Sequence, residues 1–489
     1  MSYKTERPSN PSSPKKKPKC PSDFIFSRRN SNSGDNKTLQ KVMFAMHLQS
    51  LSPGHPSSKL GRNPNTKSLI SDLTLLLPDE IMLKILSKVP KSQHNHNYLV
   101  CKRWLVFQGR LVRSLKVLDW DFLQSGRLTS RFPNLTHVDL VQGCLNLNLS
   151  LDLDGSVVLM THKLVSATIG YGIFVEHNNM LLSNEKIDYG LKVLASGCPN
   201  LRKFEVVAAS ELGLLSVAET CDALQELVLH RCSDQTLRGI SAYRNLQVLK
   251  LIGNVDGFYS SIVSEIGLTI LANGCPRLVK LELCGCEGSY DGIKALGQCC
   301  QMLEELTFFD HRMDGGWLAA LSYCENLKTL RFQSCRSFDR RPGINDYLES
   351  CRALESLHLV KCQLREKISV RTLFAICAVV KEIVIQDCWG LDNAIFGIAS
   401  VFRRVKHLSL EGCSLLTTEG LESVILFWKE LESLRVVSCK NMKVSEVSPA
   451  LSTLFSALKQ FKWRPGTKSM SDLHNTGIGK RGRKFFKKS

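Results

Sequence analysis

Leucine and other apolar residues recur along this chain with one spacing, Leu-x-x-Leu-x-Leu, usually followed three residues later by Cys. The clearest copy comprises Leu354, Leu357, Leu359 and Cys362. Side chains alternate between the two faces of a strand, so the second and third leucines of a copy share one face. The segments between copies have helical spacing, as in 187–195, and two of them end in Gly-Cys-Pro, which stops a helix. Each copy therefore predicts one short strand followed by one helix.

Fourteen segments fit this spacing, starting at residues 115, 135, 164, 201, 224, 246, 278, 303, 327, 354, 380, 405, 431 and 458. The spacing and its period of about 25 residues resemble the leucine-rich repeat. One unit cannot bury its own apolar face, so neighbouring units must stack. We therefore predict an α/β fold, a right-handed leucine-rich-repeat solenoid (horseshoe) of about 13–14 repeats over residues 113–466. Terminal repeats must close the core, and we expect Leu458, Phe461 and Trp463 to form the last one.

Residues 69–112 have a different pattern, which predicts two helices. The first begins near Pro78, with Asp79 and Glu80 in its first turn as a helix N-terminus favours, and Val89-Pro90 ends it. The second spans about residues 98–107. This segment has more apolar surface than so small a unit can bury, which predicts that it packs on a partner.

Both ends of this segment are similar to the F-box. The opening Leu77, Pro78, Glu80 and Ile81, the pair Ile85-Leu86, and the closing Val100, Cys101, Lys102 and Trp104 match that family with the expected separation. The residues between the two ends, 91–97, form a His/Asn-rich run that departs from the family pattern. With the repeats, the chain resembles the leucine-rich-repeat F-box proteins, particularly plant-like members with Cys-containing repeats, over about residues 73–464.

This resemblance implies a substrate-recognition adaptor of an SCF-type (Skp–cullin–F-box) ubiquitin ligase. The F-box would bind a Skp-type adaptor and, through it, the cullin and RING subunits, while the repeats would hold a protein substrate whose identity is unknown. No catalytic residue is then needed, and we expect the chain not to be an enzyme. The residues expected to bind the Skp-type partner are Leu77, Pro78, Ile81, Leu83, Ile85, Leu86, Val100 and Trp104.

Alternate strand residues should point away from the core and form the concave surface of the solenoid. Among them, the candidate substrate-facing residues are Lys250, Phe309, Arg331, His358, His407, Arg435, Lys462 and Arg464. The arginines and Lys462 suit an acidic or phosphorylated segment. The long steps between repeats at 164–201 and 246–278 predict inserted loops, and they leave open a small-molecule receptor of the same ligase class. A leucine-rich-repeat scaffold that does not engage a ligase also stays open.

The formal charge of +19 is concentrated in two tails. Residues 1–67 have a net charge of +10 and residues 468–489 a net charge of +6. We expect both tails, 1–68 and 467–489, to be disordered. Ser13–Lys19 resembles a nuclear import signal, so we expect the chain in the nucleus, the cytoplasm or both. Because the basic charge lies in the tails, nucleic-acid binding is the weakest of the hypotheses.

The nineteen cysteines follow the repeat. Seven lie three residues before a repeat start and seven lie eight residues after one, which predicts small buried thiols that bond weakly to backbone rather than disulfides. Cys284, Cys286, Cys299 and Cys300 lack zinc-finger spacing, so we expect no metal and no cofactor. No apolar run approaches the ~20 residues that cross a bilayer, and we expect no membrane partner.

Overall fold

The computed structural model describes residues 73–144, 181–253, 263–339 and 350–466. The two tails, the candidate repeat at 164, and residues 164–180 and 254–262 of the two long inter-repeat steps lie outside the described residues. The chain divides into two compact units, 1–108 and 109–489, so the division lies inside α4 (Lys102–Leu111). Each unit is described by itself. No helix among the described residues has the length and hydrophobicity needed to cross a membrane.

The first unit is helical, as its sequence predicts. It comprises η2 (Leu73–Leu76), α2 (Asp79–Lys88), η3 (Lys91–Gln93), α3 (His94–Asn97) and most of α4. Pro78 is the N-cap of α2 and Val89 is its C-cap. The second long helix begins at Lys102, four residues later than the spacing predicts, because Tyr98–Val100 form a turn stabilised by bonds such as Val100 N to the Asn97 carbonyl (3.4 Å).

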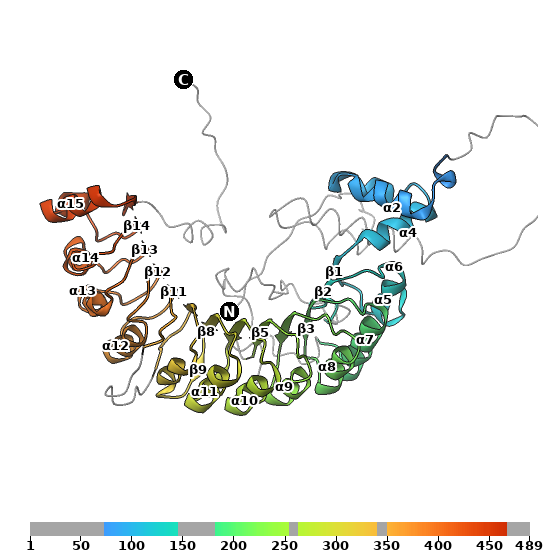
Figure 1. Ribbon diagram of the computed structural model, residues 1–489, viewed down its shortest axis with the longest axis horizontal. Helices are drawn as coiled ribbons and strands as arrows, with labels where there is room; N and C mark the ends of the chain where they lie inside the picture. Colours follow the sequence, from blue (N-terminus) through green and yellow to red (C-terminus); the bar gives the residue numbers. More distant parts are fainter. Residues whose placement is uncertain (1–72, 145–180, 254–262, 340–349, 467–489) are drawn as a thin grey trace, which may run out of the picture. The chain divides into compact units, whose positions relative to one another are not determined.

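The second unit is built on a thirteen-stranded parallel sheet in which every strand pairs with the next repeat's strand. Helices cover one face of this sheet and leave the other face as the inner surface of an arc (Figure 1). The strands are β1 (Ser114–Lys116), β2 (His137–Asp139), β3 (Lys203–Val207), β4 (Glu226–His230), β5 (Val248–Ile252), β6 (Lys280–Cys284), β8 (Glu305–Phe309), β10 (Thr329–Gln333), β11 (Ser356–Val360), β12 (Glu382–Gln386), β13 (His407–Glu411), β14 (Ser433–Val437) and β15 (Gln460–Arg464).

Most crossovers between these strands are helical. The helices are α5 (Trp120–Gln124), α6 (Arg127–Arg131), α7 (Asn184–Gly197), α8 (Glu211–Ala218), α9 (Asp234–Ile240), α10 (Glu265–Gly274), α11 (Tyr290–Cys299), η6 (Trp317–Tyr323), α12 (Lys367–Ile376), α13 (Asn393–Phe396), η8 (Gly397–Val401), α14 (Thr418–Ile425), η9 (Val444–Glu446) and α15 (Pro449–Ala457). A short second sheet pairs β7 (Glu287–Gly288) with β9 (Arg312–Met313). The α/β leucine-rich-repeat solenoid predicted from the spacing is confirmed.

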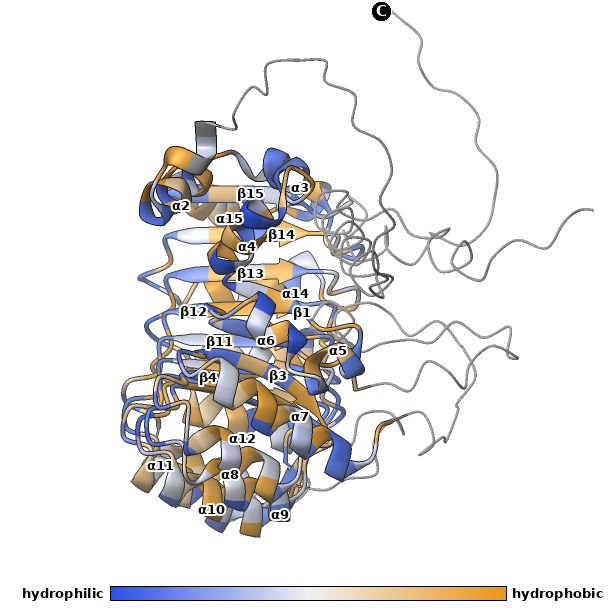
Figure 2. Ribbon diagram, turned by 90° about the vertical axis from the view of Figure 1, so that its right-hand side faces the viewer, coloured by the Kyte–Doolittle hydropathy of each residue, from blue (hydrophilic) through white to orange (hydrophobic). Residues whose placement is uncertain are grey.

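The strand register follows the leucine spacing without a slip from β3 to β15. Leu357 of β11 lies opposite Leu330 of β10 and Ile383 of β12, and all three are at most 1 % exposed. Figure 2 shows hydrophobic residues in both strands and helices, and the buried ones among them form the core. At the N-terminal end, Leu115 of β1 pairs with Val138, which lies three residues after the start of its own repeat. The first repeat therefore begins three residues earlier than the leucine spacing predicts.

The residue that follows a strand has a left-handed backbone in nine repeats. Seven of these residues are not glycine, among them Arg231 and Ser334, both with φ of 54°. The Arg231 N–H donates to the Ile252 carbonyl of the next strand at 2.8 Å, which adds one bond to the ladder. The hydrogen bond compensates for the cost of positive φ, which is about 1 kcal/mol or more per residue. The turn also directs the side chain of the next residue, usually Cys, into the core.

The cysteines of the repeat are buried free thiols, with Cys299 the exception at an intermediate exposure. The cysteine after the turn bonds to the backbone of the preceding repeat, as Cys388 Sγ does to the Leu359 carbonyl at 3.3 Å. Burial raises the pKa of the Cys232 thiol and of the Cys284 thiol to about 12. A thiol of such high pKa stays protonated at neutral pH and is a poor nucleophile, so Cys232 and Cys284 have a structural role.

Candidate functional site

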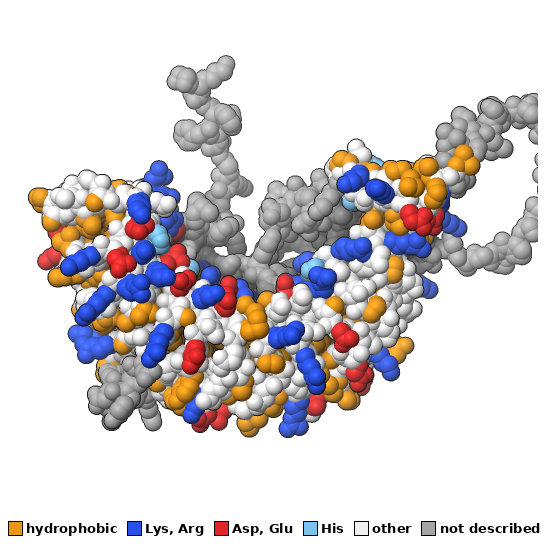
Figure 3. Space-filling model, viewed as in Figure 1, with side chains coloured by type: hydrophobic (Ala, Val, Ile, Leu, Met, Phe, Trp, Pro, Cys, Tyr) orange, Lys and Arg blue, Asp and Glu red, His pale blue; other side chains and the backbone are white. Residues whose placement is uncertain are grey.

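The helical unit presents an unusual amount of apolar surface. Leu76, Ile81, Ile85, Leu99, Val100 and Val106 are each between 45 % and 75 % exposed. Ile81 and Ile85 are four residues apart on α2, so they share one helix face. Figure 3 shows hydrophobic side chains gathered on the surface of this unit. An exposed apolar cluster on so small a unit is typical of a protein-binding surface.

The structure distributes the eight predicted partner-binding residues between surface and core. Pro78, Ile81, Ile85 and Val100 are exposed, and Leu77, Leu83 and Trp104 are partly exposed. Leu86 is fully buried beside Met82, the other buried residue of α2, so it holds the unit together rather than offering contact surface. The i,i+4 spacing alone did not separate Ile85 from Leu86.

Arg103 fixes the segment that contains Leu77 and Pro78. Its Nη1 donates to the Thr74 carbonyl and its Nη2 to the Leu77 carbonyl, both at 2.6 Å, and Nη2 also contacts Asp79 Oδ1 at 2.8 Å. Charged donors make stronger hydrogen bonds than neutral ones. Sequence reasoning missed Arg103 because it occupies a variable position of the matched motif and its partners lie more than twenty residues away.

The second candidate surface is the sheet face that the helices leave uncovered. Strand register places Lys250, Arg331, His358, Arg435 and Lys462 in one column across the sheet. Neighbouring strands are about 4.8 Å apart, so adjacent members such as Arg331 and His358 interact directly, whereas Arg331 and Arg435 are about 19 Å apart. The column therefore suits an extended ligand rather than a compact one.

Two of the predicted substrate-facing residues are nearly buried and contact other side chains of the solenoid. Lys250 is 7 % exposed, and its Nζ contacts Glu282 Oε2 at 3.2 Å. Phe309 is 9 % exposed and belongs to an apolar cluster with Val228, Ile252 and Cys284. Both therefore offer little surface to a partner.

Glu282 is the centre of a charge network that the sequence analysis did not identify. Its second oxygen contacts Lys280 Nζ at 3.3 Å, and Lys280 also contacts Glu305 at 3.1 Å. Burial by itself raises the pKa of the Glu282 carboxyl, but Lys250 and Lys280 outweigh this effect and hold it below its ordinary value. Lys250 and Glu282 lie directly opposite in register, so aligning the repeats would have paired them.

The exposed members of the predicted substrate-facing set lie on β10 and later strands. Arg331, His407, Lys462 and Arg464 are exposed. Figure 3 shows basic, acidic and histidine side chains intermingled on these repeats. His358 Nε2 lies 3.8 Å from Glu382 Oε2. Burial and the nearby Arg331 charge lower the pKa of His358 below its ordinary value, so it is neutral at pH 7.

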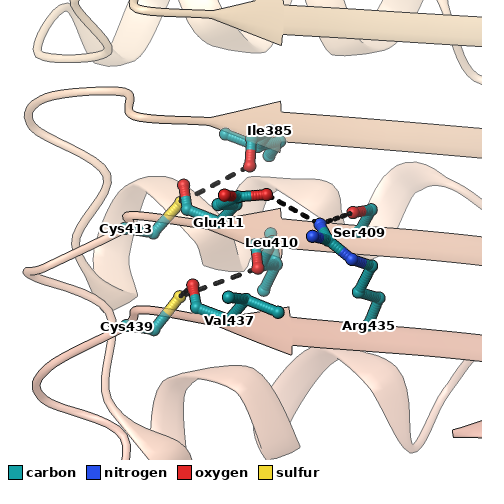
Figure 4. Close-up of polar contacts among 8 residues, drawn as sticks. All are labelled: Ile385, Ser409, Leu410, Glu411, Cys413, Arg435, Val437 and Cys439. Carbon is teal, nitrogen blue, oxygen red and sulfur yellow. Dashed lines mark hydrogen bonds and ion pairs between the residues drawn. The ribbon is translucent and has the colours of Figure 1, made fainter. Parts of the chain in front are cut away.

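Arg435 is held in place by its neighbours on β13. Its Nη1 donates to Glu411 Oε2 at 2.8 Å and to Ser409 Oγ at 3.3 Å (Figure 4). In the same view, Cys413 and Cys439 donate to the Ile385 and Leu410 carbonyls of the preceding strands. Glu411 is only 8 % exposed, so Arg435 compensates a buried charge and presents a fixed guanidinium edge at the surface.

Two hollows among the described residues are lined mainly by polar side chains. One of about 420 Å³ is lined by Arg202, Asp222, Ala223, Gln225, Asn245, Gln247 and Arg277. The other, of about 640 Å³, is lined by Asp121, Gln124, Ser125 and Tyr189 and is open to solvent. Small-molecule sites are usually enclosed and mainly apolar. No group of three or more His, Cys, Asp or Glu side chains in the described part of the chain has metal-binding geometry.

No family model matches the chain. Residues of this chain are 27 % identical over 183 positions to F-box protein SKIP19 of Arabidopsis thaliana, covering 36 % of this chain and 52 % of that protein. A second match, 25 % identical over 175 positions, is to "Putative RNA-binding protein EEED8.10" of Caenorhabditis elegans and covers 34 % of this chain and 23 % of that protein. The chain thus spans about half or less of the length of these relatives.

Matches among solved structures include TLR13 in its complex with ssRNA13, with a TM-score of 0.40 and 17 % identity over 73 % of this chain and 44 % of that one. An internalin (InlF) of Listeria monocytogenes gives a TM-score of 0.30 and 14 % identity over 58 % of this chain and 89 % of that one. The similarity to the F-box protein covers about a third of this chain.

Proposed function

We propose that this chain is the substrate-recognition adaptor of an SCF-type ubiquitin ligase. In this proposal the helical unit binds a Skp-type subunit, which connects it to the cullin and RING subunits. The solenoid binds the protein to be ubiquitinated. The chain is not itself an enzyme, and it acts in the nucleus or the cytoplasm.

The apolar surface of the helical unit carries this proposal. Ile81, Ile85 and Val100 are half exposed although they match apolar positions of the F-box pattern. Exposing them to water costs about 1 kcal/mol or more for each side chain, estimated from roughly 25 cal/mol per Å². A partner that covers the three side chains recovers this free energy, whereas leaving them in water gives no compensating gain.

Proximity supplies the mechanism. A substrate held on the solenoid and a ubiquitin-conjugating enzyme held through the Skp-type subunit react as tethered partners. Tethering replaces a bimolecular search by an effective concentration of about millimolar for short flexible connections. The adaptor therefore contributes binding and orientation, and no side chain of this chain takes part in bond formation.

Binding to a purified Skp-type subunit tests the proposal. We expect Ile81→Glu/Ile85→Glu to abolish binding measured by calorimetry, because both changes place a charge in the apolar surface without touching the buried Met82 and Leu86. The matched control, Lys84→Glu/Lys88→Glu, makes the same substitution at exposed polar positions of α2. Leu77→Ala/Pro78→Ala should also abolish binding. Full binding by the first variant would refute the assignment of this surface.

A further inference from the structure

The outer edge of β15, the last strand of the sheet, pairs with no other strand among the described residues and is called the open edge below. On its other side β15 pairs with β14, and the thirteen-strand order ends with it. Gln460 N–H donates to the Glu432 carbonyl, and the Arg464 carbonyl accepts from Ser438 N–H, so these two residues direct their backbone groups towards β14. Backbone groups of alternate residues point to opposite sides of a strand, and those of Phe461 and Trp463 therefore face the open edge.

The apolar side chains of this strand are also incompletely covered. Phe461 is 44 % exposed, whereas Leu434 and Leu408, which occupy the same register position in β14 and β13, are each 1 % exposed. Phe461 packs on Phe455 of α15 with ring centroids 4.4 Å apart, and Phe455 lies 5.1 Å from Trp463. The terminal repeat therefore does not close the core, although the sequence predicts a closing cap. Its exposed aromatic cluster is continuous with the buried layer.

Within the described residues, the indole Nε1 of Trp463 is buried and has no hydrogen-bond partner. A buried polar group without a partner is unfavourable. Trp463 belongs to β15, so this unpaired donor lies in the terminal repeat.

The positive charge on β15 indicates which kind of segment can bind at the open edge. Lys462 is exposed on the concave face of β15, flanked by Gln460 and Arg464. A symmetric antiparallel pair of two β15 strands that overlaps all five residues places Lys462 opposite Lys462, and like charges directly opposite destabilise a pair. Residues 468–489 of the chain have a net charge of +6, so they are repelled as well. An acidic segment is attracted.

We propose that β15 is a docking edge for an extended acidic segment of another protein, which adds a fourteenth strand to the sheet. Added strands bind through main-chain hydrogen bonds and gain specificity from alternate side chains. The segment alternates apolar residues, which cover Phe461 and Trp463, with Asp or Glu residues, which meet Lys462. This site is independent of the helical unit, and it stands whether or not that unit binds a Skp-type subunit.

The test uses the full chain and fluorescent peptides of alternating residues. We expect a Val/Glu peptide to bind in a fluorescence-anisotropy titration at least tenfold more tightly than a Val/Lys peptide. Methylating the backbone nitrogens that face the protein removes the main-chain donors and should abolish binding. Lys462→Glu should reverse the preference between the two peptides. The control Lys440→Glu makes the same change at an exposed site outside the strand and should alter affinity less than twofold.

Thermal unfolding of both variants confirms that the fold is retained. Several outcomes overturn the proposal: equal binding of the two peptides, full binding of the N-methylated peptide, or no binding to the unaltered chain. A dimer seen by analytical ultracentrifugation that Lys462→Glu dissociates or strengthens would identify a second copy as the occupant, and it overturns the proposal too.

Discussion

Replacing Arg103 by methionine tests how the helical unit presents Leu77 and Pro78. Methionine retains the aliphatic stem but removes all three polar contacts. It also removes the guanidinium group, whose carbon lies 5.2 Å from the Phe107 ring centre. The segment before α2 then loses its contacts with Arg103 and keeps the longer hydrogen bond that Trp104 Nε1 of α4 donates to Thr74 Oγ1 at 3.4 Å. We expect this segment to detach and α2 to become less stable, because Pro78 is the N-cap of that helix.

The size of the effect follows from the contacts. Hydrogen bonds to charged groups contribute about 1.5–3 kcal/mol each, and the lower end applies here because the Arg103 side chain is 25 % exposed. The Asp79 side chain is 55 % exposed, so its ion pair contributes about 0–1 kcal/mol. Two such hydrogen bonds and the ion pair give an expected total loss of about 3–4 kcal/mol, a large fraction of the stability of so small a unit.

Hydrogen exchange measured by mass spectrometry resolves this loss by region. Peptides from α2 and α4 should lose about 3–4 kcal/mol of protection, whereas those from β11–β13 should be unchanged, because distant repeats are energetically independent. Lys102→Met removes the same charge one residue earlier, at an exposed site, and is the matched control. Equal protection in the two variants would falsify the role assigned to Arg103.

Three further predictions concern the solenoid. Leu357→Ala empties a fully buried position and should cost about 2–5 kcal/mol in the free energy of unfolding, measured by denaturant titration; a loss below 1 kcal/mol would contradict the packing described. Glu282→Gln should destabilise the protein above pH 4.5, the ordinary pKa of the carboxyl. Because the folded-state pKa of Glu282 is lower, its contribution disappears as the pH falls through that lower value, and a pH-independent difference in melting temperature would refute this. Arg331→Met should weaken capture of an acidic substrate about fivefold or more in proximity labelling under proteasome inhibition. The exposed Arg352→Met, outside the strands, should not, and equal effects would exclude the column as the binding surface.

Periodicity was sufficient to predict the repeat because every unit solves the same packing problem. The positions of Leu357 and its equivalents in the neighbouring strands all follow from one spacing. The burial of the cysteines follows from it as well. At the ends of the solenoid the same pattern was less informative, since a terminal strand has one neighbour. The register of Leu115 and the exposure of Phe461 differ from the expectation for this reason.

For the helical unit, the sequence determined that helices form and that apolar surface remains. It did not determine which apolar residue points inward, because Ile85 and Leu86 are adjacent and both fit an amphipathic pattern. The contacts of Arg103 with Thr74 and Leu77 depend on how α4 packs against the segment before α2. A contact across such a distance is a property of the folded chain.

The same division applies to the concave surface. The sequence alone determined which residues leave the core and face outward, because side chains alternate along a strand. Only the tertiary structure decided which of them remain available. Lys250 faces Glu282 across neighbouring strands and is nearly buried, and Arg435 compensates the charge of Glu411, whereas Arg331 and Lys462 are exposed. Local periodicity fixes the direction of a side chain, but its free energy depends on charges brought beside it by folding.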